Sequence, residues 1–303
     1  MHYIVTGGAG FIGSNLVDFL IQKGHKVEVI DNFSTGKKEN CNSNAIYHNL
    51  DITDTSISNR FIEIMQNTDG IFHLAALAKV QESIEDPILY ENNNTVGTLH
   101  MLKCASDSNI KRFIYSASSA AYGNKEQMPC KETDSIDPIS PYALQKYYGE
   151  VQAKMFAKIY NIETVSLRYF NAYGERQNVN GAYATVMGVF GYQMINNQPM
   201  TIRGDGDQRR DFIYVGDIVR ANYLAMNSCK VGSGEVINIG SGASFSVNEI
   251  AKMMGGEVVY VDPVVEPKES LASIKKAKEL LSWSPEQDIK DWLPKYKKSL
   301  GIQ

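Results

Sequence analysis

The sequence predicts an α/β protein: a Rossmann-like, doubly wound parallel sheet with a smaller, loop-rich C-terminal domain. The first observation is that short apolar runs alternate with longer amphipathic segments through the first half of the chain, as strands and helices do around a parallel sheet. The second is that the apolar runs are almost continuous. Strands buried on both faces have this composition, whereas a half-exposed strand alternates.

Six runs are predicted as strands of this sheet: HYIVT (2–6), KVEVID (26–31), AIYHNLDI (45–52), GIFHLAA (70–76), RFIYSAS (112–118) and TVSLRYF (164–170). Amphipathic segments between them predict covering helices, at SNLVDFLIQKG (14–24), ISNRFIEIMQ (57–66) and TVGTLHMLKCASDS (95–108). Crossovers between parallel strands are right-handed.

The pattern becomes irregular after about residue 170. Three stretches are rich in Gly, Asn, Asp and Arg but still contain aromatic and β-branched residues: 171–186, 201–215 and 237–247. Loops held on a rigid scaffold are where binding residues concentrate. We therefore expect a first domain at 1–170, to which segments about 213–240 return, and a binding domain that is mainly 171–303.

Composition narrows the class of protein. The 303 residues carry a net charge of −4, with 43% hydrophobic residues, so nucleic acid is not an expected partner. We expect no membrane span and no secretory signal, because the N-terminus enters a strand-like run at once. The four cysteines lack metal-ligand spacing and the histidines are scattered, which predicts a cytoplasmic protein with reduced thiols and no metal site.

A glycine-rich stretch, TGGAGFIGSNLVDFL, follows the first predicted strand and opens the first helix. Gly8, Gly10 and Gly13 fit G-x-G-x-x-G, and Gly7, Gly10 and Gly13 equally fit G-x-x-G-x-x-G. Glycines there allow a tight turn and a close approach of the backbone to a pyrophosphate, which the helix N-terminus favours. Alone, such glycines are a weak signal.

The surroundings strengthen the dinucleotide interpretation. Asp31 ends the second predicted strand, where an acid can hold ribose hydroxyls and repel a 2′-phosphate, so NAD is favoured over NADP. The alternative is a turn residue before Asn32. At later strand ends, Asp51 and Ile52 fit around an adenine. Small residues, Leu74, Ala75 and Ala76, let the backbone pass along the cofactor, although plain core packing would also explain them.

The stretch SPYALQK (140–146) predicts a reactive pair at the start of a helix. Ser140 suits the N-cap and Pro141 the first helical position, so Tyr142 and Lys146 lie one turn apart on one face. A neighbouring ammonium, the positive helix start and a nicotinamide cation would each favour the phenolate over the phenol. The pair is a candidate general base, although many solvated helices carry such a pair.

Upstream, Ser116, Ser118 and Ser119 end a strand, where a serine can orient a substrate hydroxyl or merely form a turn.

Taken together, the chain resembles the extended short-chain dehydrogenase/reductase superfamily and, within it, the nucleotide-sugar epimerases of the UDP-glucose/UDP-N-acetylglucosamine 4-epimerase family. The resemblance runs nearly end to end, through GGAGFIG, DNFSTG, HLAA, SASSAAYG, YALQK, RYFNAYG, GDGDQRRDFIYVGDIV, INIGSG and SLASIKKAKELLSW. It implies that Ser118, Tyr142 and Lys146 are catalytic. It also implies an NAD site formed by Gly7, Gly10, Phe11, Ile12, Gly13, Asp31, Asn32, Ser34, Thr35, Gly36, Asp51, Ile52, Leu74, Ala75, Ala76, Ala78, Asn94, Ser116, Tyr142, Lys146 and Tyr169.

The residues after Ser118 help to choose a reaction. The related 4,6-dehydratases look as if they carry an adjacent Asp-Glu pair at these two positions, and the related decarboxylases usually carry a glutamate there. This chain has Ser119 and Ala120 instead. The resemblance therefore implies a 4-epimerase that inverts C4 through a 4-keto sugar. A 4,6-dehydratase or ketoreductase of the same superfamily remains the alternative. An NAD-binding regulatory protein without catalysis is the rival from another class.

The resemblance also implies a nucleotide-sugar site, with contacts from Asn171, the NGAY run (Asn180, Gly181, Ala182, Tyr183), Arg210, Lys268 and Ser270. Arg209 and Arg210 could instead be a solvated pair. Lys268 stands in for the arginine that relatives often have, and Ser273 replaces their usual Asp. NGAY and a small Ser270 favour an N-acetylated UDP sugar, with UDP-glucose and UDP-galactose as further candidates.

Oligomeric state is the last expectation from the sequence. The helical segments about 92–108 and 142–160 carry Leu99, Leu102, Met155, Phe156 and Ile159. In relatives these helices form a four-helix bundle across a two-fold axis, so the resemblance implies a homodimer. The alternative is that the apolar faces pack only on the sheet.

Overall fold

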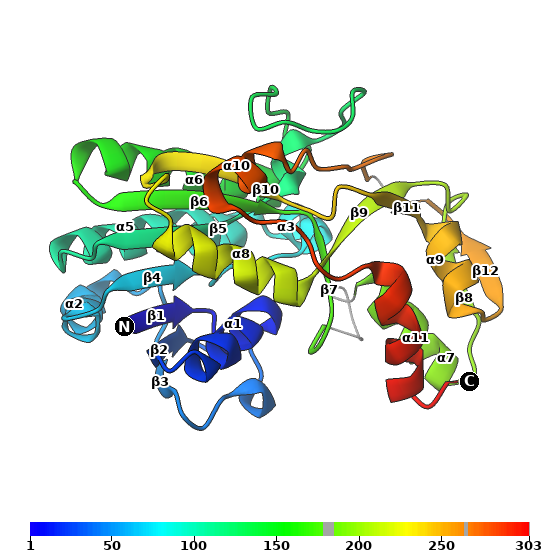
Figure 1. The fold of residues 1–303 in the computed structure, drawn as a ribbon, viewed down its shortest axis with the longest axis horizontal. Helices are drawn as coiled ribbons and strands as arrows, with labels where there is room; N and C mark the ends of the chain where they lie inside the picture. The colour runs from blue at the N-terminus through cyan, green and yellow to red at the C-terminus, as the bar shows by residue number, and fades with distance from the viewer. Residues whose placement is uncertain (178–184, 264–265, 303) are drawn as a thin grey trace.

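The computed structural model describes residues 1–177, 185–263 and 266–302. Its centre is a seven-stranded sheet in the order β10-β6-β5-β4-β1-β2-β3, and every neighbouring pair is parallel (Figure 1). The strands are β1 (His2–Thr6), β2 (Lys26–Asp31), β3 (Ile46–Asn49), β4 (Gly70–His73), β5 (Arg112–Ser118), β6 (Glu163–Tyr169) and β10 (Ser233–Ile239). The first six strands have the Rossmann order, so the predicted fold class is confirmed.

Helices cover both faces of this sheet. On one face lie α1 (Phe11–Gln22), α8 (Val215–Asn227) and α10 (Lys275–Leu281), whose apolar side chains share one buried core with the strands. On the other lie α2 (Ser58–Met65), α5 (Gly97–Asp107) and α6 (Pro141–Ile159), over a second core. Within the described residues, no helix has the length and apolar character needed to span a membrane.

A third core belongs to a smaller lobe, which Figure 1 shows beyond one end of the sheet together with the C-terminus. Its helices are α7 (Val186–Ile195), α9 (Val247–Met254) and α11 (Ile289–Ser299). Its strands are β8 (Met200–Arg203) with β12 (Val258–Val261), and β7 (Asn171–Tyr173), β9 (Arg209–Tyr214) and β11 (Ser244–Ser246). The stretches predicted as loops therefore contain short strands, which their aromatic and β-branched residues form once they pack together.

The described chain also contains short helices that connect the larger elements. They are η1 (Lys38–Asn40), η2 (Thr55–Ile57), α3 (Val80–Glu85), α4 (Pro87–Glu91), η3 (Asn92–Val96) and η4 (Ser119–Tyr122). All six predicted strands are present, with ends that differ by up to three residues. Helices α3 and α4 were not predicted, and the start of α3 lines the cavity described next.

Candidate active site

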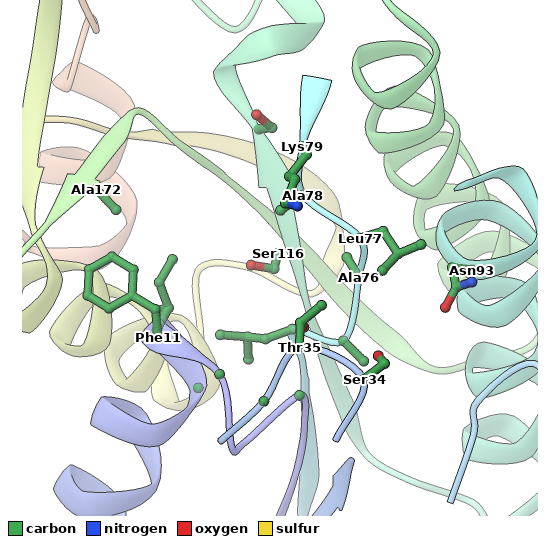
Figure 2. Close-up of a pocket in the computed structure, with 18 of the residues that line it drawn as sticks. Phe11, Ser34, Thr35, Ala76, Leu77, Ala78, Lys79, Asn93, Ser116 and Ala172 are labelled. Carbon is green, nitrogen blue, oxygen red and sulfur yellow. The ribbon is translucent and has the colours of Figure 1, made fainter. Parts of the chain in front are cut away.

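A cavity of about 730 Å³ opens at the carboxyl ends of the parallel strands. Residues that follow β1, β2, β4, β5 and β6 line it, because parallel strands end at one edge of their sheet. Figure 2 shows Ser116 inside the cavity, between Phe11 on one side and Ala76 on the other. The cavity brings together every predicted catalytic and cofactor residue except Asp51 and Asn94.

The glycine loop forms the floor of the cavity where α1 begins. Gly7 has φ +70°, and a Cβ there would lie 2.7 Å from the backbone nitrogen of Ala75. A Cβ on Gly13 would lie 2.1 Å from the carbonyl oxygen of Gly7, so this helix approaches the loop too closely for any side chain. No side chain caps α1 and no acid stands in its first turn. A helix start of this kind, with its amides lining a cavity, fits the pyrophosphate of a dinucleotide.

Asp31 lines the cavity at the end of β2 and also holds the loops around it. One carboxylate oxygen accepts the Ala9 N–H at 2.9 Å, and the other accepts the Phe33 N–H at 2.8 Å. Each oxygen keeps acceptor capacity for a ribose hydroxyl, because a carboxylate oxygen has two lone pairs. The fit to an NAD ribose is therefore retained, and Asp31 is fixed in place before any ligand arrives.

Asn94 and Asp51, which were expected around the cofactor, do not line the cavity. The Asn94 amide accepts the Leu77 N–H at 2.8 Å and donates to the Leu77 carbonyl at 2.9 Å, so it holds the wall segment after β4. Asp51 accepts hydrogen bonds from Thr53 and from the Asn32 side chain at 2.9 Å. Burial raises the pKa of Asp51, but these hydrogen bonds outweigh it and lower the pKa overall.

The start of α6 presents Tyr142 to the cavity. Ser140 caps the helix by accepting the Ala143 N–H at 3.2 Å, and Pro141 occupies the first turn as predicted. The Tyr142 N–H would otherwise be an unpaired group of the helix start, and it donates to the Ser83 hydroxyl at 3.2 Å. Ser83 in turn donates to the Val80 carbonyl at 2.5 Å. This chain of contacts ties the catalytic candidate to the cavity wall at α3.

Lys146 lies one turn further along α6 and is buried against β5. Its Nζ donates to the Ser116 carbonyl at 2.9 Å and lies 5.3 Å from the centre of the Tyr115 ring. Burial lowers the pKa of Lys146 to about 8, while the carboxylate of Glu150 acts in the opposite direction. The amine is therefore still mostly protonated at neutral pH.

Tyr142 differs from the sequence-based expectation in its electrostatics. Burial raises the pKa of its phenol, and a hydrogen bond with Ser118 opposes this shift. The sequence led us to expect a phenol made more acidic by Lys146 and the helix start, whereas burial acts against its ionisation. Burial therefore favours a neutral phenol at Tyr142, with the Ser118 hydroxyl within hydrogen-bonding reach.

Among the described residues that were predicted to bind the nucleotide sugar, Ser118 and Tyr142 line the cavity, whereas Asn171, Arg210, Lys268 and Ser270 do not. Arg210 forms an ion pair with Glu266 at 2.6 Å, and Glu266 rather than the arginine lines the cavity. Asn171 donates to the Ser270 hydroxyl at 3.1 Å, which places both in a contact between the lobe and its neighbouring loop. Lys268 contributes its carbonyl oxygen, which accepts the Arg209 N–H. The NGAY run, residues 180–183, lies outside the described residues.

The sequence also failed to predict part of the lining. Lys79, Val80 and Gln81 of the α3 segment line the cavity, as do Thr185 and Glu266 from the smaller lobe. Lys79 pairs with Glu82. The one available signal was position, because residues 77–81 continue directly from a strand end. Among the described residues, no group of three or more His, Cys, Asp or Glu side chains could hold a metal ion.

Comparison with known proteins agrees with this geometry. The family described as NAD dependent epimerase/dehydratase matches residues 3–240. A putative UDP-glucose 4-epimerase of Methanocaldococcus jannaschii is 38% identical, over 95% of this chain and 94% of that protein. Among solved structures, the UDP-glucose 4-epimerase of Thermotoga maritima with UDP-glucose has a TM-score of 0.93 at 38% identity, covering 99% of this chain and 100% of that one. The UDP-N-acetylglucosamine 4-epimerase of Methanobrevibacter ruminantium, in complex with UDP-N-acetylmuramic acid, has a TM-score of 0.91 at 38% identity, covering 98% and 97%.

Proposed function

The chain belongs to the NAD dependent epimerase/dehydratase family, and from this premise we propose that it is an NAD-dependent enzyme that inverts C4 of a UDP-linked sugar. The observation that carries the proposal is the single cavity in which the glycine loop, Ser118, Tyr142 and Lys146 meet. Relatives with 38% identity over nearly the whole chain are 4-epimerases of UDP-glucose and UDP-N-acetylglucosamine.

The chain's own residues would divide the work as follows. The glycine loop and the α1 start would hold the pyrophosphate of NAD, and Asp31 a ribose. Bound NAD supplies the acceptor and donor of the hydride. Tyr142 would act as its phenolate, which the Lys146 ammonium favours. The phenolate would take the proton of the sugar 4-hydroxyl and return it to the 4-keto oxygen after the sugar has turned, with Ser118 orienting that oxygen. Lys146 contributes a fixed positive charge beside the phenol.

The alternative reactions receive less support from the cavity. A 4,6-dehydratase needs an acid–base pair beyond the serine, and here Ser119 and Ala120 begin η4 instead. The carboxylates that line the described part of the cavity are Asp31 and Glu266, and both are already engaged by loop amides or by Arg210. A purely regulatory NAD-binding protein would not need Ser118, Tyr142 and Lys146 together.

The test is to incubate the purified protein, without added cofactor, with UDP-glucose, UDP-galactose and their N-acetylated forms, and to identify the products. A 4-epimerase interconverts a pair without consuming NADH, whereas a ketoreductase consumes it stoichiometrically. Tyr142→Phe should retain cofactor binding and lose turnover by orders of magnitude. Turnover that survives this change, or a 6-deoxy product, would contradict the proposal.

We also propose that both N-acetylated and unacetylated UDP sugars are accepted. The relatives reported above include both types. The predicted gate residue Ser270 accepts a hydrogen bond from Asn171 at 3.1 Å and does not line the cavity, so it supports neither sugar in particular. Comparing kcat/KM for the two pairs measures the preference. Exclusive use of either pair would overturn this part of the proposal.

We further propose a homodimer through α6 and the helix before it. Two of the expected contact residues, Leu102 and Phe156, are buried in the core instead, at 0% and 2% exposure. The remaining face is apolar and exposed, with Val96, Leu99, Leu144, Tyr148, Val151, Met155 and Ile159. Val151→Glu should convert a dimer to a monomer in light scattering after gel filtration, and a monomeric parent protein would refute the assignment. A cytoplasmic location is consistent with the four free cysteines.

A further inference from the structure

A buried ion pair lies directly behind Lys146. Glu150, one turn further along α6, accepts two hydrogen bonds from Arg168 of β6, each of 2.7 Å. The two side chains are only 2% and 3% exposed. The Arg168 guanidinium also stacks on the Tyr122 ring at 4.6 Å, which fixes its plane. Burying a charge pair this deeply costs desolvation free energy, and apolar side chains of similar size are often at least as stabilising. Stability alone therefore does not explain the presence of the pair.

The spacing along α6 places this pair within reach of the amine. Residues four apart on a helix share a face, so Tyr142, Lys146 and Glu150 form one row that faces the sheet. The helix lies unusually close to β5 at this point, because the Tyr115 hydroxyl occupies the space of a Cβ on Gly149. That hydroxyl donates to the Lys146 carbonyl at 3.3 Å. The row is therefore held against the strands in a dry environment.

The titratable groups around the Lys146 amine come from four elements: Tyr142 and Glu150 on α6, His73 on β4, Tyr115 on β5, and Arg168 and Tyr169 on β6. Most of these groups are neutral near pH 7. Burial lowers the pKa of His73 to about 3, raises that of Tyr169 to about 12 and raises those of Tyr142 and Tyr115. Among the described residues, Glu150 is thus the anion whose charge acts on Lys146.

We propose that Glu150 is a positioning residue for the reaction: its carboxylate, clamped by Arg168, keeps Lys146 a cation in the cavity at neutral pH. This inference rests on the proposed function for its purpose, because a neutral amine would not support the phenolate. Burial raises the pKa of Glu150, and the hydrogen bonds and positive charge of Arg168 act against that rise, so Arg168 favours the carboxylate form. The two charges therefore act in sequence, the arginine on the glutamate and the glutamate on the lysine.

The experiment follows the ionisation of Lys146 itself, without relying on turnover. The protein is labelled with lysine carrying ¹³C at Cε, and the Lys146 resonance, assigned by its loss in Lys146→Arg, is followed from pH 6 to pH 11. In Glu150→Gln the midpoint should fall by about one pH unit or more, the size expected when a nearby opposite charge is lost from a buried site. The alkaline limb of kcat/KM should move to lower pH by the same amount.

Glu150→Gln leaves Arg168 buried and unpaired, which can prevent folding. The double variant Glu150→Leu/Arg168→Met replaces the pair with apolar side chains of similar size. It should show a smaller downward shift, because it removes the Arg168 cation together with the Glu150 anion. Glu163→Gln is the matched control, because it breaks the Arg112–Glu163 pair at the opposite ends of β5 and β6. That variant should leave the midpoint in place.

An unchanged or raised Lys146 midpoint in both the single and the double variant overturns the inference. A shift of equal size in Glu163→Gln does so too, because it would show a general response to lost stability. If no UDP sugar is turned over by the parent protein while the midpoint still falls in the Glu150 variants, the proposed function fails and the electrostatic role of Glu150 stands. The two conclusions are therefore tested separately.

Discussion

Gly149→Ala should destabilise the protein although it places a better helix former in α6. A Cβ at Gly149 would lie 2.1 Å from the Tyr115 hydroxyl and 2.2 Å from the ring carbon that bears it. Helix and ring would have to separate by about 1.3 Å to reach ordinary contact at 3.4 Å. Such overpacking costs about 1–3 kcal/mol, and the lost Tyr115–Lys146 hydrogen bond about 1 kcal/mol more. Helix propensity offsets about 1 kcal/mol.

The expected net loss is therefore about 1–3 kcal/mol in the free energy of unfolding, measured by urea denaturation followed by circular dichroism. A double-mutant cycle that combines Gly149→Ala with Tyr115→Leu tests whether the contact with the Tyr115 ring causes this loss, because the smaller leucine makes room for the new methyl group. The double variant should be more stable than the sum of the single effects by at least about 1 kcal/mol. A Gly149→Ala protein as stable as the parent, or additive single effects, would refute the close approach of α6 and β5.

Three further predictions concern single side chains. Burial lowers the pKa of His73 to about 3, so the unfolded chain binds one more proton than the folded chain as the pH falls below 6.5. The free energy of unfolding should then drop by up to about 1.4 kcal/mol per pH unit. Urea denaturation at pH 7 and pH 5 should show this loss, and His73→Asn should remove it. Ser83→Ala removes the acceptor of the Tyr142 N–H and should lower kcat about tenfold with little change in KM in steady-state assays; an equal change in both constants would argue against a positioning role. Glu266→Gln frees Arg210 from a partly exposed ion pair and should lower KM for the nucleotide sugar about two- to five-fold; a higher KM would indicate that Glu266 itself binds the substrate.

The parallel sheet could be predicted because its strands are buried on both faces and therefore read as unbroken apolar runs. Strand β5 is one example, with six of its seven residues buried. The short strands of the smaller lobe lack this signal. Strand β12 is exposed along its whole length, and β11 has only three residues. Their pairing with β8 and β9 depends on contacts between distant parts of the chain, which local pattern does not contain.

The cavity could be predicted where residues follow a strand end or a glycine turn, because the fold itself brings those positions to one edge. Asn94 illustrates the limit. It resembles a cofactor contact by its motif, but its amide is used by both backbone groups of Leu77. Arg210 illustrates another limit, because Glu266, the acid that pairs with it, lies 56 residues away in the sequence. A motif gives the position of a side chain, whereas its available hydrogen bonds depend on neighbours that only the folded chain supplies.

The pKa values of the catalytic candidates have one physical origin. Burial raises the pKa of Tyr142 and lowers that of Lys146, so it drives both groups toward their neutral forms. A phenolate in such a cavity needs a nearby positive charge, and a neutral lysine would supply none. The same low dielectric that creates this difficulty also strengthens the effect of any one buried charge. Glu150, four residues after Lys146, therefore opposes the loss of charge that burial favours at the amine, while the pKa of Lys146 stays below its usual value. Phenol, amine and carboxylate on one helical face act as a single unit, and the helix spacing of Y-x-x-x-K-x-x-x-E is what makes that unit possible.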